Sequence, residues 1–150
     1  MYQNILVAID GSPTSDLALH EALRIAQDGT RVRAVTVIVD PLAGYGTPAF
    51  TLDHDAVHEA CIKHGEEVLR KAENDAKHLG QVKLETQLIN LAPSAMPDVA
   101  ASILQASKDY HADLIVIGRI GKSGVKRFLL GAVADHVVRQ SLIPVLIVHG

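Results

Sequence analysis

The stretch Asn4-Ile-Leu-Val-Ala-Ile9 is a short continuous run of apolar residues, and Asp10-Gly-Ser-Pro-Thr14 follows it directly. The apolar run predicts a buried strand, and the glycine and proline after it predict a turn. Ser12 suits the N-cap of a helix and Pro13 suits its first turn, so we expect a helix that ends near Gln27. This order of strand, turn and helix is typical of a βαβ unit.

Outward from this unit, strand and helix patterns alternate along the chain. Further strands are expected at 32–39, 82–89, 114–117 and 145–148, and further helices at 53–79, after Pro97, and at 129–140. Such alternation indicates a parallel sheet with right-handed crossovers. We therefore predict one α/β domain over residues 1–150, a doubly wound parallel five-stranded sheet with helices on both faces.

The composition fits this fold and excludes other classes. Of the 150 residues 48% are hydrophobic but only 3% aromatic, so the core must consist of Val, Ile, Leu and Ala, as in parallel sheets covered on both faces. The scarcity of aromatic residues argues against a nucleic-acid binder of the stacking type, and a net charge of −3 argues against non-specific duplex binding.

The cysteine count and the N-terminus bear on the compartment. A single cysteine, Cys61, excludes an internal disulfide framework. The chain begins directly with a strand pattern, lacks the features of a signal peptide, and has no apolar run long enough to span a membrane. We expect a cytoplasmic protein without membrane insertion.

Two segments that follow expected strands are candidates for a ligand site. In doubly wound sheets, ligands bind beyond the carboxyl ends of the strands, where the strand order reverses. The turn at Asp10–Ser12 and the glycine-rich loop from Gly118 onward occupy such positions. A helix expected to begin near Gly131 would add free N–H groups for an anion, and nearby cations are Lys122, Lys126 and Arg127.

Glycines after a strand can also have a purely local role. An isolated Gly-x-x-Gly more often just permits a tight turn than binds a ligand. The position of this loop opposite an Asp-Gly-Ser turn favours the binding interpretation.

Four segments together resemble the universal stress protein family. They are Val7-Ala-Ile-Asp10-Gly-Ser12, the Gly118-x-x-Gly121 pair with nine residues before Gly131, Ala112-Asp-Leu-Ile-Val-Ile-Gly118, and Pro144-Val-Leu-Ile-Val148. The resemblance extends over essentially the whole chain. It implies a Rossmann-like sheet of strand order 3-2-1-4-5 and an adenine-nucleotide (ATP or AMP) binding regulator in a bacterial-type stress response.

The resemblance also implies roles for individual residues. Asp10 would lie near the ribose and a nucleotide-bound Mg²⁺, the backbone of Ile38 would meet adenine, and the glycines would line the ribose and phosphates. The implied nucleotide-binding residues are Ala8, Asp10, Gly11, Ser12, Ile38, Ile117, Gly118, Arg119, Gly121, Lys122, Gly131, Ala132 and Val133. Pairing of residues 145–148 across a two-fold axis would form a homodimer, with a regulatory protein as a further partner.

One departure from the family pattern concerns the phosphates. ATP-binding members have a hydroxyl directly after the third glycine and often another two residues later, where this chain has Ala132 and Ala134. A hydrogen bond to a charged group contributes about 1.5–3 kcal/mol, so each missing hydroxyl lowers the expected affinity about tenfold or more. Two alternatives therefore stay open, a nucleotide-independent dimeric scaffold and a weak ATPase that would use Arg119, Lys122 or Arg127. No enzymatic activity beyond slow ATP hydrolysis is expected.

Two further features allow more than one interpretation. His54, His58 and Cys61 share one face of the expected helix 53–79 and could hold a metal ion. The favoured interpretation is a packed stripe that continues through Val68, Ala72, Ala76 and Leu79, with Cys61 as a buried thiol. The loop 41–51 is either a plain connection or a flap over adenine, with Tyr45 or Phe50 as ring contacts.

Overall fold

The computed structural model of the protein describes residues 1–39, 54–80, 82–91, 98–119 and 124–150, excepting the side chains of residues 54 and 124–130. The predicted flap 41–51, and Gly121 and Lys122 of the glycine-rich loop, lie outside the described residues. The elements in chain order are β1 (Asn4–Ala8), α1 (Pro13–Ile25), β2 (Arg31–Ile38), α2 (His54–Leu79), β3 (Leu84–Asn90), α3 (Val99–Asp109), β4 (Leu114–Gly118), α4 (Gly124–Gln140) and β5 (Val145–Val148).

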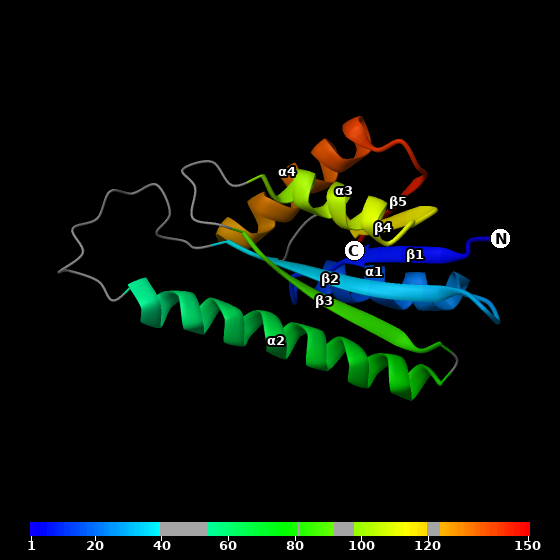
Figure 1. Cartoon of the computed structure of the whole chain (residues 1–150), viewed down its shortest axis with the longest axis horizontal. Coiled ribbons are helices and arrows are strands. Elements are labelled where there is room, and N and C mark those ends of the chain that lie inside the picture. Colours follow the sequence, from blue (N-terminus) through cyan, green and yellow to red (C-terminus); the bar gives the residue numbers. More distant parts are fainter. Residues whose placement is uncertain (40–53, 81, 92–97, 120–123) are drawn as a thin grey trace.

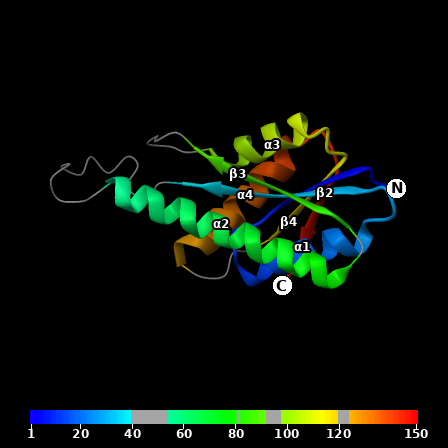
Figure 2. The same ribbon diagram turned by 60° about the horizontal axis from the view of Figure 1, so that its bottom comes forward.

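The strands form one sheet of order β3-β2-β1-β4-β5, in which each neighbouring pair is parallel. Both the predicted fold class and the strand order implied by the family resemblance are confirmed. Helices α1 and α2 cover one face of the sheet, and α3 and α4 cover the other (Figure 1, Figure 2). Successive residues of β1 alternate between the two cores, with Ile5 and Val7 in one and Leu6 and Ala8 in the other.

The turn after β1 is organised by its own polar side chains. Asp10 Oδ1 accepts the Ser12 N–H at 2.9 Å, and the Ser12 hydroxyl accepts the Ser15 N–H at 3.2 Å as the N-cap of α1. The Ser15 hydroxyl in turn donates to the Ser12 carbonyl at 2.9 Å and accepts the Asp10 N–H at 3.2 Å. The predicted cap is confirmed, and α1 ends at Ile25, slightly before the predicted Gln27.

Helix α4 begins earlier than the sequence predicted. It starts at Gly124, so Gly131, Ala132 and Val133 lie well inside it. Only the first four N–H groups of a helix lack an intrahelical acceptor, so the prediction of free N–H groups at Gly131 is wrong. Glycine lowers helix stability by about 1 kcal/mol relative to alanine but does not end a helix by itself, and no proline interrupts 124–140.

A second polar cluster ties β2, β3 and α3 together, away from the carboxyl ends of the strands. Glu85 accepts from Arg33 at 2.8 Å and from Arg31 at 3.1 Å, and both guanidinium groups stack on the Tyr110 ring at 4.2 and 5.0 Å. The hydrogen bond from Arg33 is the main reason that the pKa of Glu85 lies below its usual value. Because Tyr110 is the C-cap of α3 and is buried, the cluster fixes that end of α3 on the sheet.

The end of β4 approaches the start of α1 very closely. A Cβ on Gly118 would lie 2.8 Å from Thr14 Cγ2 and 3.0 Å from both the Thr14 backbone carbonyl carbon and its oxygen. Backbone atoms cannot give way as a flexible side chain can. Gly118 is therefore required by packing, independently of any ligand.

We expect Gly118→Ala to destabilise the protein by about 1–3 kcal/mol, because the added methyl overpacks the contact between β4 and α1. Gly131→Ala is the matched control, since its Cβ would meet no described atom nearer than Arg119 O at 3.6 Å. In urea unfolding, Gly131→Ala should be neutral or raise stability by up to about 1 kcal/mol. Equal effects of the two substitutions would contradict the packing role of Gly118.

Candidate functional site

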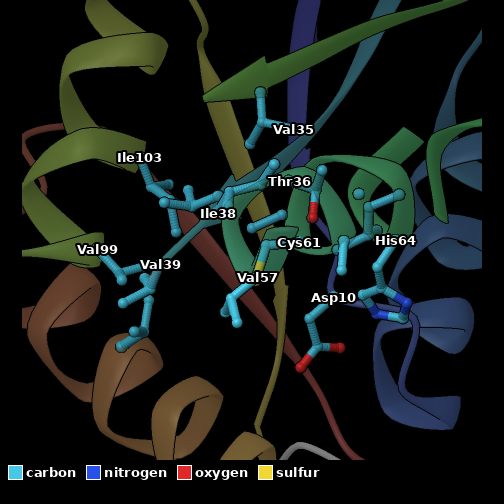
Figure 3. Close-up of a pocket in the computed structure, with 16 residues that line it drawn as sticks. Asp10, Val35, Thr36, Ile38, Val39, Val57, Cys61, His64, Val99 and Ile103 are labelled. Carbon is cyan, nitrogen blue, oxygen red and sulfur yellow. The ribbon is translucent and has the colours of Figure 1, made fainter. Parts of the chain in front are cut away.

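A cavity of about 540 Å³ lies at the carboxyl ends of β1 and β2 (Figure 3). Its walls come from the two strand ends and from one face each of α2, α3 and α4. The lining residues are Ala8, Ile9, Asp10, Val35, Thr36, Val37, Ile38, Val39, Val57, Ala60, Cys61, His64, Gly65, Val99, Ile103 and Val133. The cavity lies next to β1, which has β2 on one side and β4 on the other. Doubly wound folds bind ligands at such a point, where the strand order reverses.

The cavity has an apolar part and a polar end. Most lining side chains are aliphatic, whereas Asp10 and His64 are seen in Figure 3 on the side opposite Val99, Val39 and Ile103. A largely apolar cavity with a few convergent polar groups is the usual form of a small-molecule site. Such a site can enclose a flat apolar ring and hydrogen-bond the hydroxyls attached to it.

Asp10 is held in place at the polar end. It lies two residues after the end of β1, is half-buried, and is oriented by the hydrogen bond from the Ser12 N–H to Oδ1. A carboxylate can accept several hydrogen bonds, so acceptor capacity for a ligand hydroxyl or a hydrated cation is left. This hydrogen bond stabilises the turn by itself, so it accounts for an aspartate at position 10 even if no ligand binds there.

Some of the residues implied by the family resemblance line the cavity. These are Ala8, Asp10, Ile38 and Val133. Gly11 follows Asp10 in the turn, and Ser12 is buried beneath it as the cap of α1. Ile38 accepts the Leu91 N–H at its carbonyl, at 3.3 Å, and this directs its backbone toward β3.

Others lie beside the cavity or outside the described residues. Ile117 is buried in β4 opposite Ala8, and Gly118 packs on Thr14. Arg119 is exposed, and its N–H donates to Val148 at 2.9 Å. Gly131 is half-buried and Ala132 is exposed on α4, whereas Gly121 and Lys122 are among the residues not described.

Ala134, where the family pattern often has a hydroxyl, has an environment unlike that of Ala132. Only 3% of Ala134 is exposed, and it belongs to the core that α3 and α4 form on the sheet. A hydroxyl at 134 would enter an apolar core and not the cavity. Ala134 is therefore explained by packing, whereas Ala132 is exposed and is not among the residues that line the cavity.

One wall of the cavity was missed by the sequence prediction. Val57, Ala60, Cys61, His64 and Gly65 line the cavity from α2, and of these only Cys61 was part of the predicted packed stripe. Accordingly Cys61 is half-buried and not the predicted buried thiol. A signal was present in the sequence, because a thiol, an imidazole and a glycine replace the aliphatic residues that a core stripe uses.

The rest of that stripe behaves as predicted except at its end. Val68, Ala72 and Ala76 are buried, but Leu79 is 52% exposed, so its assignment to the core was wrong. His58 Nε2 lies 3.2 Å from the side-chain nitrogen of Asn90, an interaction with β3. No cluster suited to a metal ion occurs among the described residues, and the side chain of His54 is not one of them.

Gly65 sets the distance between α2 and the sheet. A Cβ at this position would lie 2.9 Å from Leu88 Cδ1 and 3.2 Å from Ile38 Cδ1. Both residues are on strands, and Ile38 also lines the cavity. A larger residue at 65 must push α2 away from the sheet or push Ile38 toward the cavity.

We expect Gly65→Ala to change the cavity more than the overall stability. The methyl group meets the ends of two flexible side chains, so overpacking of about 1 kcal/mol offsets most of the gain of replacing glycine in a helix. Urea unfolding should show a change within about 1 kcal/mol, and ligand affinity should fall because Ile38 moves. Unchanged affinity for a bound ligand would show that Ile38 does not form part of its site.

Comparison with known proteins agrees with this architecture. The family model described as the universal stress protein family matches residues 1–149. The chain is 32% identical to a universal stress protein of Methanocaldococcus jannaschii over 148 residues, covering 99% of this chain and 82% of the relative. It is 33% identical to one of Bacillus subtilis over 158 residues, covering 99% of this chain and all of the relative.

A solved universal stress protein in complex with cAMP superposes with a TM-score of 0.68 at 28% identity, covering 99% of this chain and 97% of that one. Among the described helices, none is both long and apolar enough to cross a bilayer. The match of the family model over nearly the whole chain, together with the sheet order, shows that this protein belongs to the universal stress protein family.

Proposed function

We propose that this protein binds an adenine nucleotide in the cavity between β1, β2 and α2 and acts as a nucleotide-responsive regulator. The observation that carries the proposal is the cavity itself, whose aliphatic part suits a purine and whose polar end presents Asp10 to a ribose. The 28% identical universal stress protein solved with cAMP supports the choice of an adenine nucleotide. Slow hydrolysis is the most catalytic activity that we expect of this site.

The backbone that would meet adenine belongs to Val39 rather than to Ile38. Along a strand, successive residues direct their N–H and C=O groups to opposite neighbours. Val35 accepts the Ile9 N–H toward β1, whereas Ile38 accepts the Leu91 N–H toward β3. Val37 and Val39 therefore direct their polar groups to the crevice beyond the end of β1, and both line the cavity.

The phosphates would extend from the ribose toward β4 and α4. Asp10 would hold Mg²⁺ together with the phosphates, since Mg²⁺ is usually bound by one or two carboxylates plus substrate oxygens. Arg119 and Gly131 complete the proposed phosphate region, Gly131 through the room that its missing side chain leaves for a bound group. Because Ala132 offers no hydroxyl there, we expect modest affinity for the terminal phosphates of ATP.

The single cysteine gives a direct test of where a nucleotide binds. Cys61 lines the cavity, so a bound nucleotide should shield its thiol from iodoacetamide. With ligand at ten times its dissociation constant, the alkylation rate measured by mass spectrometry should fall about tenfold, because about a tenth of the protein is then free.

Equal concentrations of inorganic phosphate serve as the control and should give no protection. Binding by calorimetry without protection of Cys61 would place the nucleotide elsewhere on the protein. If ATP, AMP and cAMP all fail to bind at millimolar concentration, the nucleotide proposal is wrong, and the alternative of a nucleotide-independent scaffold is favoured.

We also propose that the protein is a homodimer that pairs β5 with its copy. β5 is an edge of the sheet, and an edge strand presents unpaired N–H and C=O groups that a second chain can use. The carbonyl of Pro144 accepts from Ile115 of β4, and that of Val148 accepts from Arg119 just after β4. Alternate residues of β5 therefore face β4, and Ile147 directs its N–H outward. Leu142, just before β5, is 92% exposed and adds apolar surface nearby.

Two substitutions of Ile147 distinguish the contribution of backbone hydrogen bonds to the proposed dimer from the contribution of apolar packing. Ile147→Pro removes the outward N–H, whereas Ile147→Ala loses the apolar contacts but keeps that N–H. By light scattering, the wild type and Ile147→Ala should have about twice the 16.1 kDa mass of one chain, and Ile147→Pro should have the mass of one chain. A dimeric Ile147→Pro variant would exclude this interface.

A further inference from the structure

The wall of the cavity contains a buried hydroxyl for which the described part of the chain supplies no partner. Thr36 of β2 lines the cavity, and only 5% of the residue is exposed. The other buried hydroxyls, those of Ser12, Ser15, Thr30 and Ser107, each make a hydrogen bond within the protein. Among the residues that the structure describes, none hydrogen-bonds the hydroxyl of Thr36. Because buried polar side chains are rarely left unpaired, this one needs an explanation.

The unpaired hydroxyl belongs to a side chain on the α2 side of the sheet. Alternate residues of a strand face the same side, and Val32 and Ala34 belong to the core beneath α1 and α2, so Thr36 faces that core as well. Within the described residues, the fully enclosed side-chain atom without a hydrogen bond is Arg33 Nε. The oxygen of Thr36 is thus not enclosed, and Figure 3 shows the residue among those that surround the cavity.

The surroundings of Thr36 on this side of the sheet are apolar. Leu88 is its partner on β3, and Ile38 is the next residue of β2 on the same face. Helix α2 passes over these two residues at Gly65, where a Cβ would lie 2.9 Å from Leu88 Cδ1 and 3.2 Å from Ile38 Cδ1. Gly65 also lines the cavity and has no side chain that could hydrogen-bond the hydroxyl. The hydroxyl therefore faces the cavity and not a polar group of the helix.

The fold does not require a hydroxyl at this position. The other buried residues of β2 are aliphatic, namely Val32, Ala34, Val35 and Ile38. Valine has nearly the same shape as threonine and is equally suited to a strand, and it would bury no polar group. A ligand with a polar group at this point of the cavity accounts for the threonine.

We propose that the Thr36 hydroxyl hydrogen-bonds the nucleoside of a bound adenine nucleotide and contributes to its selection. The inference rests on the proposed nucleotide site and adds to it a residue outside the Asp10 turn and the phosphate region. A threonine hydroxyl donates and accepts, so it can pair with a purine nitrogen, the amino group or a ribose hydroxyl. An apolar molecule of similar size would leave the hydroxyl unpaired, so the site disfavours such a molecule.

The test is calorimetric titration of the full-length protein with AMP and with adenosine. Thr36→Val removes the hydroxyl and keeps the shape, so affinity for AMP should fall about threefold to tenfold, as the loss of one neutral hydrogen bond predicts. Affinity for adenosine should fall by the same factor, because the two ligands share the nucleoside. Thr36→Ser keeps the hydroxyl and should recover most of the loss. Without ligand, the Tm of Thr36→Val should not fall and should rise by up to about 4 °C, because no hydroxyl is then buried.

Thr30→Val is the matched control, because Thr30 is also a buried threonine but does not line the cavity. Its hydroxyl accepts the Gln27 N–H at 3.1 Å and donates to the Tyr2 carbonyl at 3.0 Å. This substitution should lower Tm by about 2–6 °C and leave affinity for both ligands unchanged.

Equal affinity of the wild type and Thr36→Val would overturn the inference. A loss confined to AMP would overturn it too, and so would a loss in Thr36→Ser as large as that in Thr36→Val. Failure of the wild type to bind any adenine nucleotide would instead overturn the proposed function on which the inference rests.

Discussion

The structure depends on β1 being the central strand, buried on both faces and paired on both sides. Ile5, Leu6 and Val7 are wholly inaccessible, with β2 and β4 as parallel neighbours. The chain leaves β1 toward β2 through the helix layer of α1, and β4 is entered from the layer of α3, so the strand order reverses at β1. Asp10, the first polar residue after β1, consequently lines the crevice that forms at this point.

Helix α2 uses one continuous stripe for two purposes. In its second half the stripe is aliphatic and packs into the core, as Val68, Ala72 and Ala76 show. In its first half it faces the cavity with Cys61 and His64. Gly65 lies at the change between them and allows the helix to approach the sheet closely. The half of α2 that packs into the core thereby fixes the distance between β2 and the half that lines the cavity.

The fold was predictable because each strand is a compact aliphatic run and each crossover carries its own helix signals. The N-cap at Ser12 followed from local chemistry alone, and the structure confirms it. The wall formed by α2 was not predictable in the same way. Helical periodicity indicates which residues share a face, but whether that face meets a packed core or an open cavity depends on where β1 and β2 end.

The two errors at helix ends have a related origin. Leu79 matched the apolar stripe of α2, yet it is the last residue of the helix and is 52% exposed. For α4, a glycine was taken as a boundary, although backbone hydrogen bonds sustain the helix through Gly131. In both cases the sequence pattern is correct over the middle of the element, and tertiary contacts decide its ends.

The glycines of the family motif do not all support the same conclusion. Gly118 would be needed in any protein with this contact between β4 and α1, so its presence says little about a ligand. Gly131 is different, because it lies inside a helix where alanine would be more stable by about 1 kcal/mol, and its Cβ would make only ordinary van der Waals contact with Arg119 O. Packing against the described residues therefore does not account for a glycine at 131, whereas the close approach of a bound group would. Gly131, more than Gly118, is thus the motif residue that supports the proposed phosphate region.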